Sequence, residues 1–252
     1  MLGIKKKKWE WSIFGKHPAV NDFIKIGSKD KDLSLFYQWV QNCYDKIRPE
    51  IHKDHKIHSW RFWVKSPAKG HLICGLVRDS CDKVGRSYPI LIIGTGHLPG
   101  WEKNWDLLPF SCEKTWMQIE SISTMRTSGI QDFQESLVLI NKPISDWEKL
   151  KDKRGNPYTI NDNNNNNSTS AWNLDDIECL AQSKINEEYF IEPIKLISLE
   201  HSFIMIEKWH YILKKFNHKP GSIFMGGISD KLYIAVFNRS LKSDDFNQLW
   251  SI

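Results

Sequence analysis

The chain has 252 residues, 40% of them hydrophobic and 26% charged, a composition typical of a globular protein that can bury a core. Its net charge of +5 is a small excess of 35 basic over 30 acidic side chains, and part of it lies in the lysine run 5–8. Neither this mild charge nor one short basic run indicates a nucleic-acid partner. The 12 Trp and 12 Phe side chains each bury a large area, so we expect an aromatic-rich core.

The first half of the chain predicts one helix and four strands. Residues 9–14 alternate as a strand and are followed by a polar turn at 15–22. Apolar residues recur at three- and four-residue steps over 33–47, which predicts a helix capped by Asp32 and ended by Pro49. Further strands are expected at 60–64, 72–77 and 88–93.

The second half predicts fewer elements. Helices are expected at 112–123 and 130–140. Residues 152–170 include the tract NDNNNNNSTS, which cannot bury apolar area and predicts a disordered or mobile surface loop. Beyond it we expect only a helix at 201–216, strands at 223–226 and 232–237, and a terminal turn of helix.

These C-terminal elements are too few to cover a core of their own. We expect them to complete the sheet of the N-terminal half, so that residues 1–252 form a single domain with an inserted loop at about 152–170. The predicted fold class is α/β (α+β), with a central mixed, largely antiparallel sheet flanked by helices.

Cysteine usage and hydropathy bear on the cellular compartment. The five cysteines are odd in number and form no Cys-x-x-Cys pair, which argues against a disulfide framework and a zinc ribbon. The N-terminus shows no apolar signal segment, and no stretch approaches the roughly 18 uninterrupted apolar residues of a membrane span. We therefore expect a cytoplasmic protein with no direct membrane insertion.

The segment 72–94 places a crowded polar turn between two apolar runs, an arrangement in which functional residues are often found. Gly85 can adopt a positive φ, and Pro89 favours extended backbone at Tyr88. In a structural interpretation Asp82 caps the turn and Arg86 pairs with an acidic neighbour. In a functional interpretation this turn and the turn at 16–22 lie side by side and form a contact surface. Both interpretations stay open. The polar residues that crowd the turn include Asp79, Asp82, Lys83, Arg86 and Ser87.

Three motifs follow one another along the chain. They comprise Gly15, Lys16, Pro18, Asp22 and Phe23; then Trp60, Arg61 and Phe62; then Asp82, Val84, Gly85, Arg86 and Pro89. In this order the motifs resemble the TagF family, known also as ImpM. Asn21 stands where the family usually has Gly, and because Asn tolerates left-handed backbone angles, we expect the turn to be kept. The segment SIFMGG at 222–227 resembles the family's C-terminal strand.

The resemblance implies an accessory protein of a bacterial type VI secretion system. Proteins of this family act in the cytoplasm as post-translational regulators, typically repressors, and bind a forkhead-associated (Fha-like) scaffold or another secretion component. The implied mechanism is stoichiometric binding without catalysis or a cofactor. The candidate residues for partner binding or for the structural motif are Lys16, His17, Asn21, Asp22, Arg61, Asp79, Asp82, Arg86 and Ser87.

The alternative is a hydrolase or phosphatase-like enzyme that uses His17, Asp22 and Asp82, since these are the side-chain types of nucleophilic and acid–base catalysis. Ser87 lacks the Gly-x-Ser-x-Gly elbow of many hydrolases, and Gly15-Lys16 lacks the spacing of a phosphate loop. We therefore favour a protein that is not an enzyme.

One histidine series could bind a metal. On a continuous helix, His52, His55 and His58 would place neighbouring imidazoles close together. Their charged surroundings after Pro49 favour a solvated loop or a frayed helix end instead, and we expect no metal site.

Overall fold

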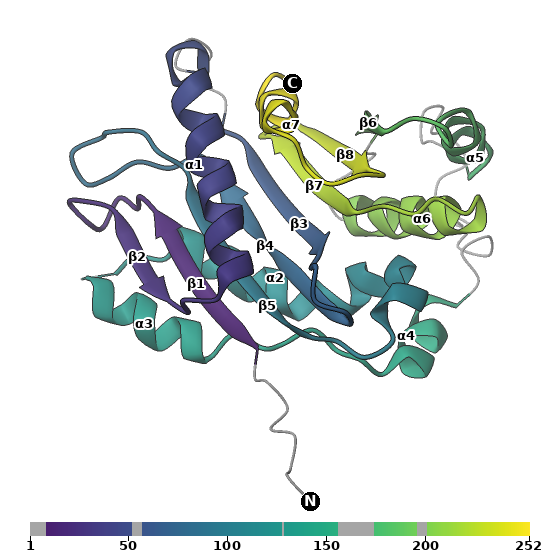
Figure 1. The fold of residues 1–252 in the computed structure, drawn as a ribbon, viewed down its shortest axis with the longest axis horizontal. Coiled ribbons are helices and arrows are strands. Elements are labelled where there is room, and N and C mark those ends of the chain that lie inside the picture. The colour runs from purple at the N-terminus through teal and green to yellow at the C-terminus, as the bar shows by residue number, and fades with distance from the viewer. Residues whose placement is uncertain (1–8, 52–56, 128, 156–173, 196–200) are drawn as a thin grey trace, which may run out of the picture.

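The computed structural model describes residues 9–51, 57–127, 129–155, 174–195 and 201–252. Eight strands form one sheet in the order β2-β1-β5-β4-β3-β7-β8-β6, and helices cover both of its faces (Figure 1). Every strand pairing in the described part of the chain is antiparallel. The predicted class of helices around a largely antiparallel sheet is confirmed.

The N-terminal strands form the first half of the sheet. The predicted strands at 9–14, 60–64 and 72–77 are confirmed, whereas the strand predicted at 88–93 begins later because the Tyr88 N–H bonds to Ser80 O within the turn and Pro89 has no N–H. A short edge strand after the first turn was not predicted, since four residues carry little periodic signal. The strands are β1 (Glu10–Gly15), β2 (Ile24–Gly27), β3 (Ser59–Lys65), β4 (His71–Arg78) and β5 (Ile90–His97).

Helix α1 (Lys31–Ile51) lies across one face of the sheet (Figure 1). Its start is capped by Asp30, whose carboxylate accepts hydrogen bonds from the N–H groups of Asp32 and Leu33. The predicted cap at Asp32 is therefore wrong: that carboxylate accepts a hydrogen bond from the Ser66 hydroxyl instead. The predicted end at Pro49 is also wrong, because the helix continues to Ile51. A proline removes one backbone hydrogen bond, which a helix held by its packed face can tolerate.

The opposite face is covered by α2 (Leu108–Thr124), α3 (Ile130–Val138), α5 (Leu174–Ser183) and α6 (His201–Lys215), with α4 (Trp147–Arg154) at one end. The short 3-10 helices η1 (Trp101–Lys103) and η2 (Trp105–Leu107) precede α2. Helix α2 begins earlier than predicted because Pro109 stands in its first turn, where a missing N–H costs nothing. Within the described ranges, none of the helices combines the length and hydropathy needed to cross a membrane.

The C-terminal strands join the same sheet, as expected, because β7 (Ser222–Ile228) pairs with β3. It is followed by β8 (Lys231–Phe237) and by α7 (Ser243–Trp250), which packs beside α1. The edge strand β6 (Tyr189–Ile194) and helix α5 were not predicted; Pro193 weakens the strand pattern, and edge strands are where proline is tolerated. The single-domain interpretation stays a prediction.

The predicted polar loop at 152–170 starts too early. Its first residues, through Arg154, belong to α4, whose Asp146 cap accepts from the Lys149 N–H. Residues 156–170 lie outside the described residues, so the rest of that prediction stays a prediction.

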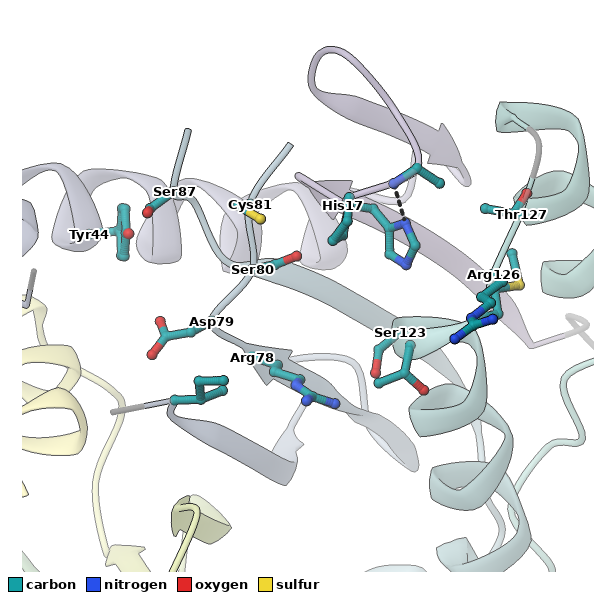
Figure 2. Close-up of a pocket in the computed structure, with 15 residues that line it drawn as sticks. His17, Tyr44, Arg78, Asp79, Ser80, Cys81, Ser87, Ser123, Arg126 and Thr127 are labelled. Atoms are coloured by element: carbon teal, nitrogen blue, oxygen red, sulfur yellow. Dashed lines mark hydrogen bonds between the residues drawn. The ribbon is translucent and has the colours of Figure 1, made fainter. Parts of the chain in front are cut away.

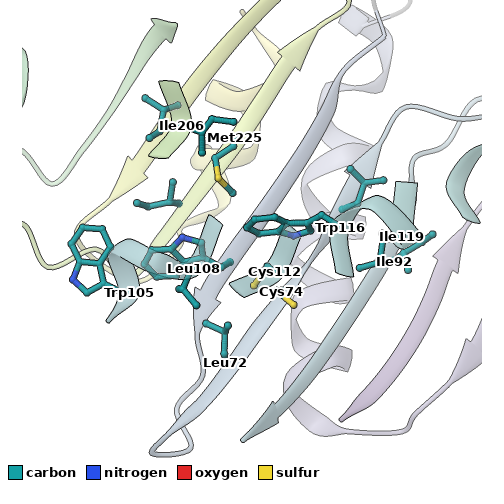
Figure 3. Close-up of a cluster of buried hydrophobic side chains, with 14 of the residues drawn as sticks. Leu72, Cys74, Ile92, Trp105, Leu108, Cys112, Trp116, Ile119, Ile206 and Met225 are labelled. Atoms are coloured by element: carbon teal, nitrogen blue, oxygen red, sulfur yellow. The ribbon is translucent and has the colours of Figure 1, made fainter. Parts of the chain in front are cut away.

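The central strands are buried on both faces, which explains their continuous apolar sequences. In β4, Leu72, Cys74 and Leu76 face the α2 side, while Ile73 and Val77 face α1. Figure 3 shows Cys112 and Trp116 of α2 near Cys74. The expected aromatic core is confirmed: the largest fully buried side chains include Trp60, Trp63, Trp116 and Trp209.

Helix α6 carries a buried carboxyl group, Glu207, that is 8% exposed. Burial raises its pKa to about 8; Glu113 adds a smaller increase, and Lys153 and Arg154 oppose the shift. Because the folded pKa lies above the unfolded value of about 4.3, the folded protein holds an extra proton between these values and loses stability as the pH rises from about 4.5 to 8.

We predict that Glu207→Gln stabilises the protein by about 2 kcal/mol at pH 8.5 but little at pH 5, because the amide never has to ionise in the core. Urea unfolding at both pH values measures the difference. Glu148→Gln is the control, since the Glu148 side chain is 84% exposed. Equal effects of Glu207→Gln at both pH values would show that Glu207 does not ionise in this window.

Candidate functional site

Two turns lie side by side at one end of the sheet. The first follows β1 and spans 16–23; the second connects β4 to β5 and spans 79–89. The Lys83 N–H donates to Val20 O (2.9 Å), and Nη2 of Arg86 donates to Asn21 O (2.8 Å). We call the joined pair the paired turns.

Asp82 is the centre of the paired turns, and its side chain is fully buried. Its Oδ1 accepts from the Val84 and Arg86 N–H groups at 3.1 and 2.8 Å. Its Oδ2 lies 2.6 Å from Nε of Arg86 and 3.0 Å from Nζ of Lys16. Arg86 therefore pairs with Asp82, one of the three acidic residues, with Asp79 and Asp22, that the structural interpretation allows as its partner.

The ionisation of Asp82 follows from these contacts. Burial alone raises the pKa of a carboxyl group, but hydrogen bonds from the Arg86 N–H, the Lys16 ammonium and the Arg86 guanidinium outweigh it and hold the pKa of Asp82 well below its usual range. Asp82 is thus a carboxylate at neutral pH, and it joins the first turn to the second.

Two glycines give the paired turns their backbone shape. Gly15 has φ +110°, and a Cβ built on it would lie 1.9 Å from Pro89 O. Gly85 has φ +84°, and a Cβ there would meet no atom within 4 Å. Glycine is required at Gly15 by both conformation and close approach, and at Gly85 by conformation alone.

The outer side of the paired turns exposes apolar and cationic side chains. Phe23 is 42% and Val84 67% exposed, and the Arg86 side chain is 56% exposed. The Phe23 ring packs edge-on against Tyr88 at 4.5 Å and lies 5.3 Å from Nζ of Lys16. Exposed apolar groups beside cations suit a protein partner.

Two of the predicted site residues contact other elements and do not contribute to this exposed outer side. Asp79 accepts hydrogen bonds from the His58 backbone and imidazole at 2.8 and 2.9 Å and from the Trp250 indole at 2.9 Å. Arg61 forms a two-point ion pair with Glu120 of α2, at 2.5 and 2.6 Å. These contacts join β3, β4, α2 and α7, and no sequence signal connected residues so far apart.

A cavity of about 660 Å³ opens next to the paired turns (Figure 2). His17 and Ser87 lie in its wall. The His17 Nδ1 accepts from the Ala19 N–H (3.2 Å), and its ring packs edge-on against Phe133 at 4.9 Å. Burial lowers the pKa of His17, and a hydrogen bond with the Ser123 backbone partly opposes that shift.

The geometry does not assemble the enzymatic alternative. Asp22 is exposed and, among the described residues, accepts a hydrogen bond only from the Phe23 N–H (2.7 Å), and Asp82 is bound to Lys16 and Arg86. In the part of the chain that the structure describes, no hydrogen bond joins His17 to either carboxylate.

The metal hypothesis concerned His52, His55 and His58. His52 and His55 lie outside the described residues, and His58 bonds to Asp79. Among the residues described, no three His, Cys, Asp or Glu side chains are arranged to hold a metal ion.

The protein is thus an antiparallel sheet covered by helices, and its paired turns expose apolar and cationic side chains. The chain belongs to the TagF family, since the family described as "TagF N-terminal domain, Type VI secretion system-associated" matches residues 12–139. That match includes all three sequence motifs.

A solved structure is similar to part of the chain. The crystal structure of PA0076 from Pseudomonas aeruginosa PAO1 is 18% identical, with a TM-score of 0.41, over 53% of this chain and 64% of that one. The chain thus spans less than two thirds of that structure. No curated protein matches the chain.

Proposed function

We propose that this protein is a non-enzymatic accessory protein of a type VI secretion system that regulates the system post-translationally, as a repressor, by binding a cytoplasmic scaffold component. The association with type VI secretion comes from the family match over residues 12–139. The observation that carries the binding role is the exposure of Phe23 and Val84 on turns that are fixed from below by a buried carboxylate.

The physical argument is preorganisation. Asp82 binds Lys16 and Arg86, so both turns keep one backbone conformation. A surface that is already ordered loses less conformational entropy on binding than a mobile loop. The charge arrangement favours a partner with an apolar pocket and an acidic rim, since Lys83 and Arg86 flank Val84 on the exposed side.

The partner we propose is the forkhead-associated (Fha-like) scaffold that the family resemblance implies. Binding at the paired turns would sequester this scaffold, and no covalent step is needed. Phe23, Val84 and Arg86 are the residues we expect at the centre of the contact, because aromatic and arginine side chains contribute much of the binding energy in protein interfaces.

Val84→Asp tests this proposal. The substitution places a negative charge on the exposed apolar tip while leaving the contacts of Asp82 in place. We expect at least a tenfold loss of scaffold affinity, about 1.4 kcal/mol, with unfolding unchanged within about 0.5 kcal/mol. Pull-down and calorimetry with the scaffold measure binding, and secretion assays in cells measure the loss of repression.

Val138→Asp is the matched control, because Val138 is 73% exposed and is the last residue of α3. It should leave binding unchanged. Equal binding by the wild type and Val84→Asp would contradict the proposed surface. Turnover of an ester or phosphoester that disappears in His17→Ala or Asp22→Ala would contradict the non-enzymatic role.

A further inference from the structure

The cavity beside the paired turns has walls from several elements. His17 comes from the first turn, Arg78 from the end of β4, Tyr44 from α1 and Arg126 from the segment after α2. Its volume of about 660 Å³ falls in the range of about 300–1,000 Å³ that is usual for small-molecule sites. Neither the family match nor the proposed scaffold contact accounts for this cavity.

Two arginines distinguish the cavity from the rest of the molecule. Of the arginine side chains that the structure describes, Arg61, Arg86, Arg154 and Arg239 each pair with a carboxylate. The remaining two, Arg78 and Arg126, have no ion pair or hydrogen bond with any described residue, and both line this cavity. Figure 2 shows them on either side of Ser123.

The acidic group in the cavity wall does not neutralise these arginines. Asp79 is the carboxylate among the described lining residues, and it already accepts hydrogen bonds from His58 and Trp250. Figure 2 shows its carboxylate directed away from the Arg78 guanidinium. Two positive charges from separate elements therefore face the same space.

The remaining lining residues indicate which other groups a bound anion could carry. The hydroxyls of Ser80 and Ser87 have no hydrogen-bond partner among the described residues, and both line the cavity. Tyr44, Ile57 and Met125 are large apolar residues of the lining. A ligand that suits this lining carries both an oxyanion and an apolar group.

We propose that this cavity binds a phosphate monoester. Arg78 and Arg126 bind the phosphate oxygens, Ser80 donates a hydrogen bond to them, and the organic group packs on apolar residues of the lining such as Tyr44. A phosphate monoester carries a charge of about −1.5 to −2 at pH 7. This charge matches two guanidinium groups better than the single negative charge of a carboxylate ligand does. The phosphate can belong to a free small molecule or to a phosphorylated side chain of a protein.

Titration calorimetry with phenyl phosphate tests the site, with inorganic phosphate and phenol as the separate halves of the probe. We expect phenyl phosphate to bind at least tenfold more tightly than either half. Arg78→Gln and Arg126→Gln should each weaken binding at least tenfold, because each removes a charge-assisted contact. Lys114→Gln is the control. It removes an exposed charge on α2 that does not line the cavity, so this variant should bind phenyl phosphate normally.

Thermal unfolding of each variant separates lost binding from lost folding, and Ser80→Ala gives a second, milder variant with an expected two- to threefold loss. Comparison with a short phosphoserine peptide distinguishes the two phosphate sources: a free small molecule is indicated if phenyl phosphate binds more tightly. The proposal would be overturned if phenyl phosphate showed no saturable binding at concentrations up to about 10 mM, which corresponds to a very weak affinity. Binding that both arginine variants retain would overturn it as well.

Discussion

Gly15→Ala should lower the free energy of unfolding by more than about 4 kcal/mol, at the extreme end of single-substitution effects. The added Cβ would lie 1.9 Å from Pro89 O, which is backbone and cannot move without separating β1 from β5. The φ of +110° adds conformational strain for any residue with a Cβ. Urea unfolding followed by tryptophan fluorescence measures the loss.

Gly85→Ala is the matched control, because it has the same kind of positive φ without the contact. We expect it to cost only about 1 kcal/mol, the cost of a left-handed conformation. Equal losses at Gly15 and Gly85 would mean that close approach to Pro89 is not what requires glycine at Gly15.

Asp82→Asn should lower the melting temperature by roughly 10 °C, because it leaves the Lys16 ammonium without its carboxylate in a site where the Lys16 side chain is 7% exposed. Asn keeps the shape of Asp82 and its ability to accept from the Val84 N–H, so the loss reports on the charge. Differential scanning calorimetry at pH 7 measures it.

The effect of Asp82→Asn should depend on pH with a definite sign. The folded pKa of Asp82 is lowered, so its contribution is present above the unfolded pKa of about 3.9 and declines as the pH falls below that value. The wild type and Asp82→Asn should therefore converge in stability in acid. Asp22→Asn, which changes an exposed carboxylate, should show neither effect. A difference that persists unchanged at low pH would assign the role of Asp82 to shape rather than charge.

The local elements of this fold could be predicted because their determinants are local. The strands at 60–64 and 72–77 are continuous apolar runs, and the three-and-four spacing from Leu33 shows the buried face of α1. Elements with weak local signals were missed: β2 has four residues, and β6 contains Pro193. Asp30 was missed as a cap because Asp32 lies next to the same helix start, and only the hydrogen bonds distinguish them.

The sequence by itself determined the family, since three motifs lie in order between Gly15 and Pro89, and it determined that polar turn residues gather after two apolar strands. Only the tertiary structure decided which of them meet. Antiparallel pairing of β1 with β5 brings Lys16 to Asp82, whereas the C-terminal helix brings Trp250 to Asp79, so that Asp79 is committed to holding α7. That Arg78 and Arg126 have no carboxylate partner among the described residues is likewise invisible in a sequence, because pairing depends on neighbours that are distant along the chain.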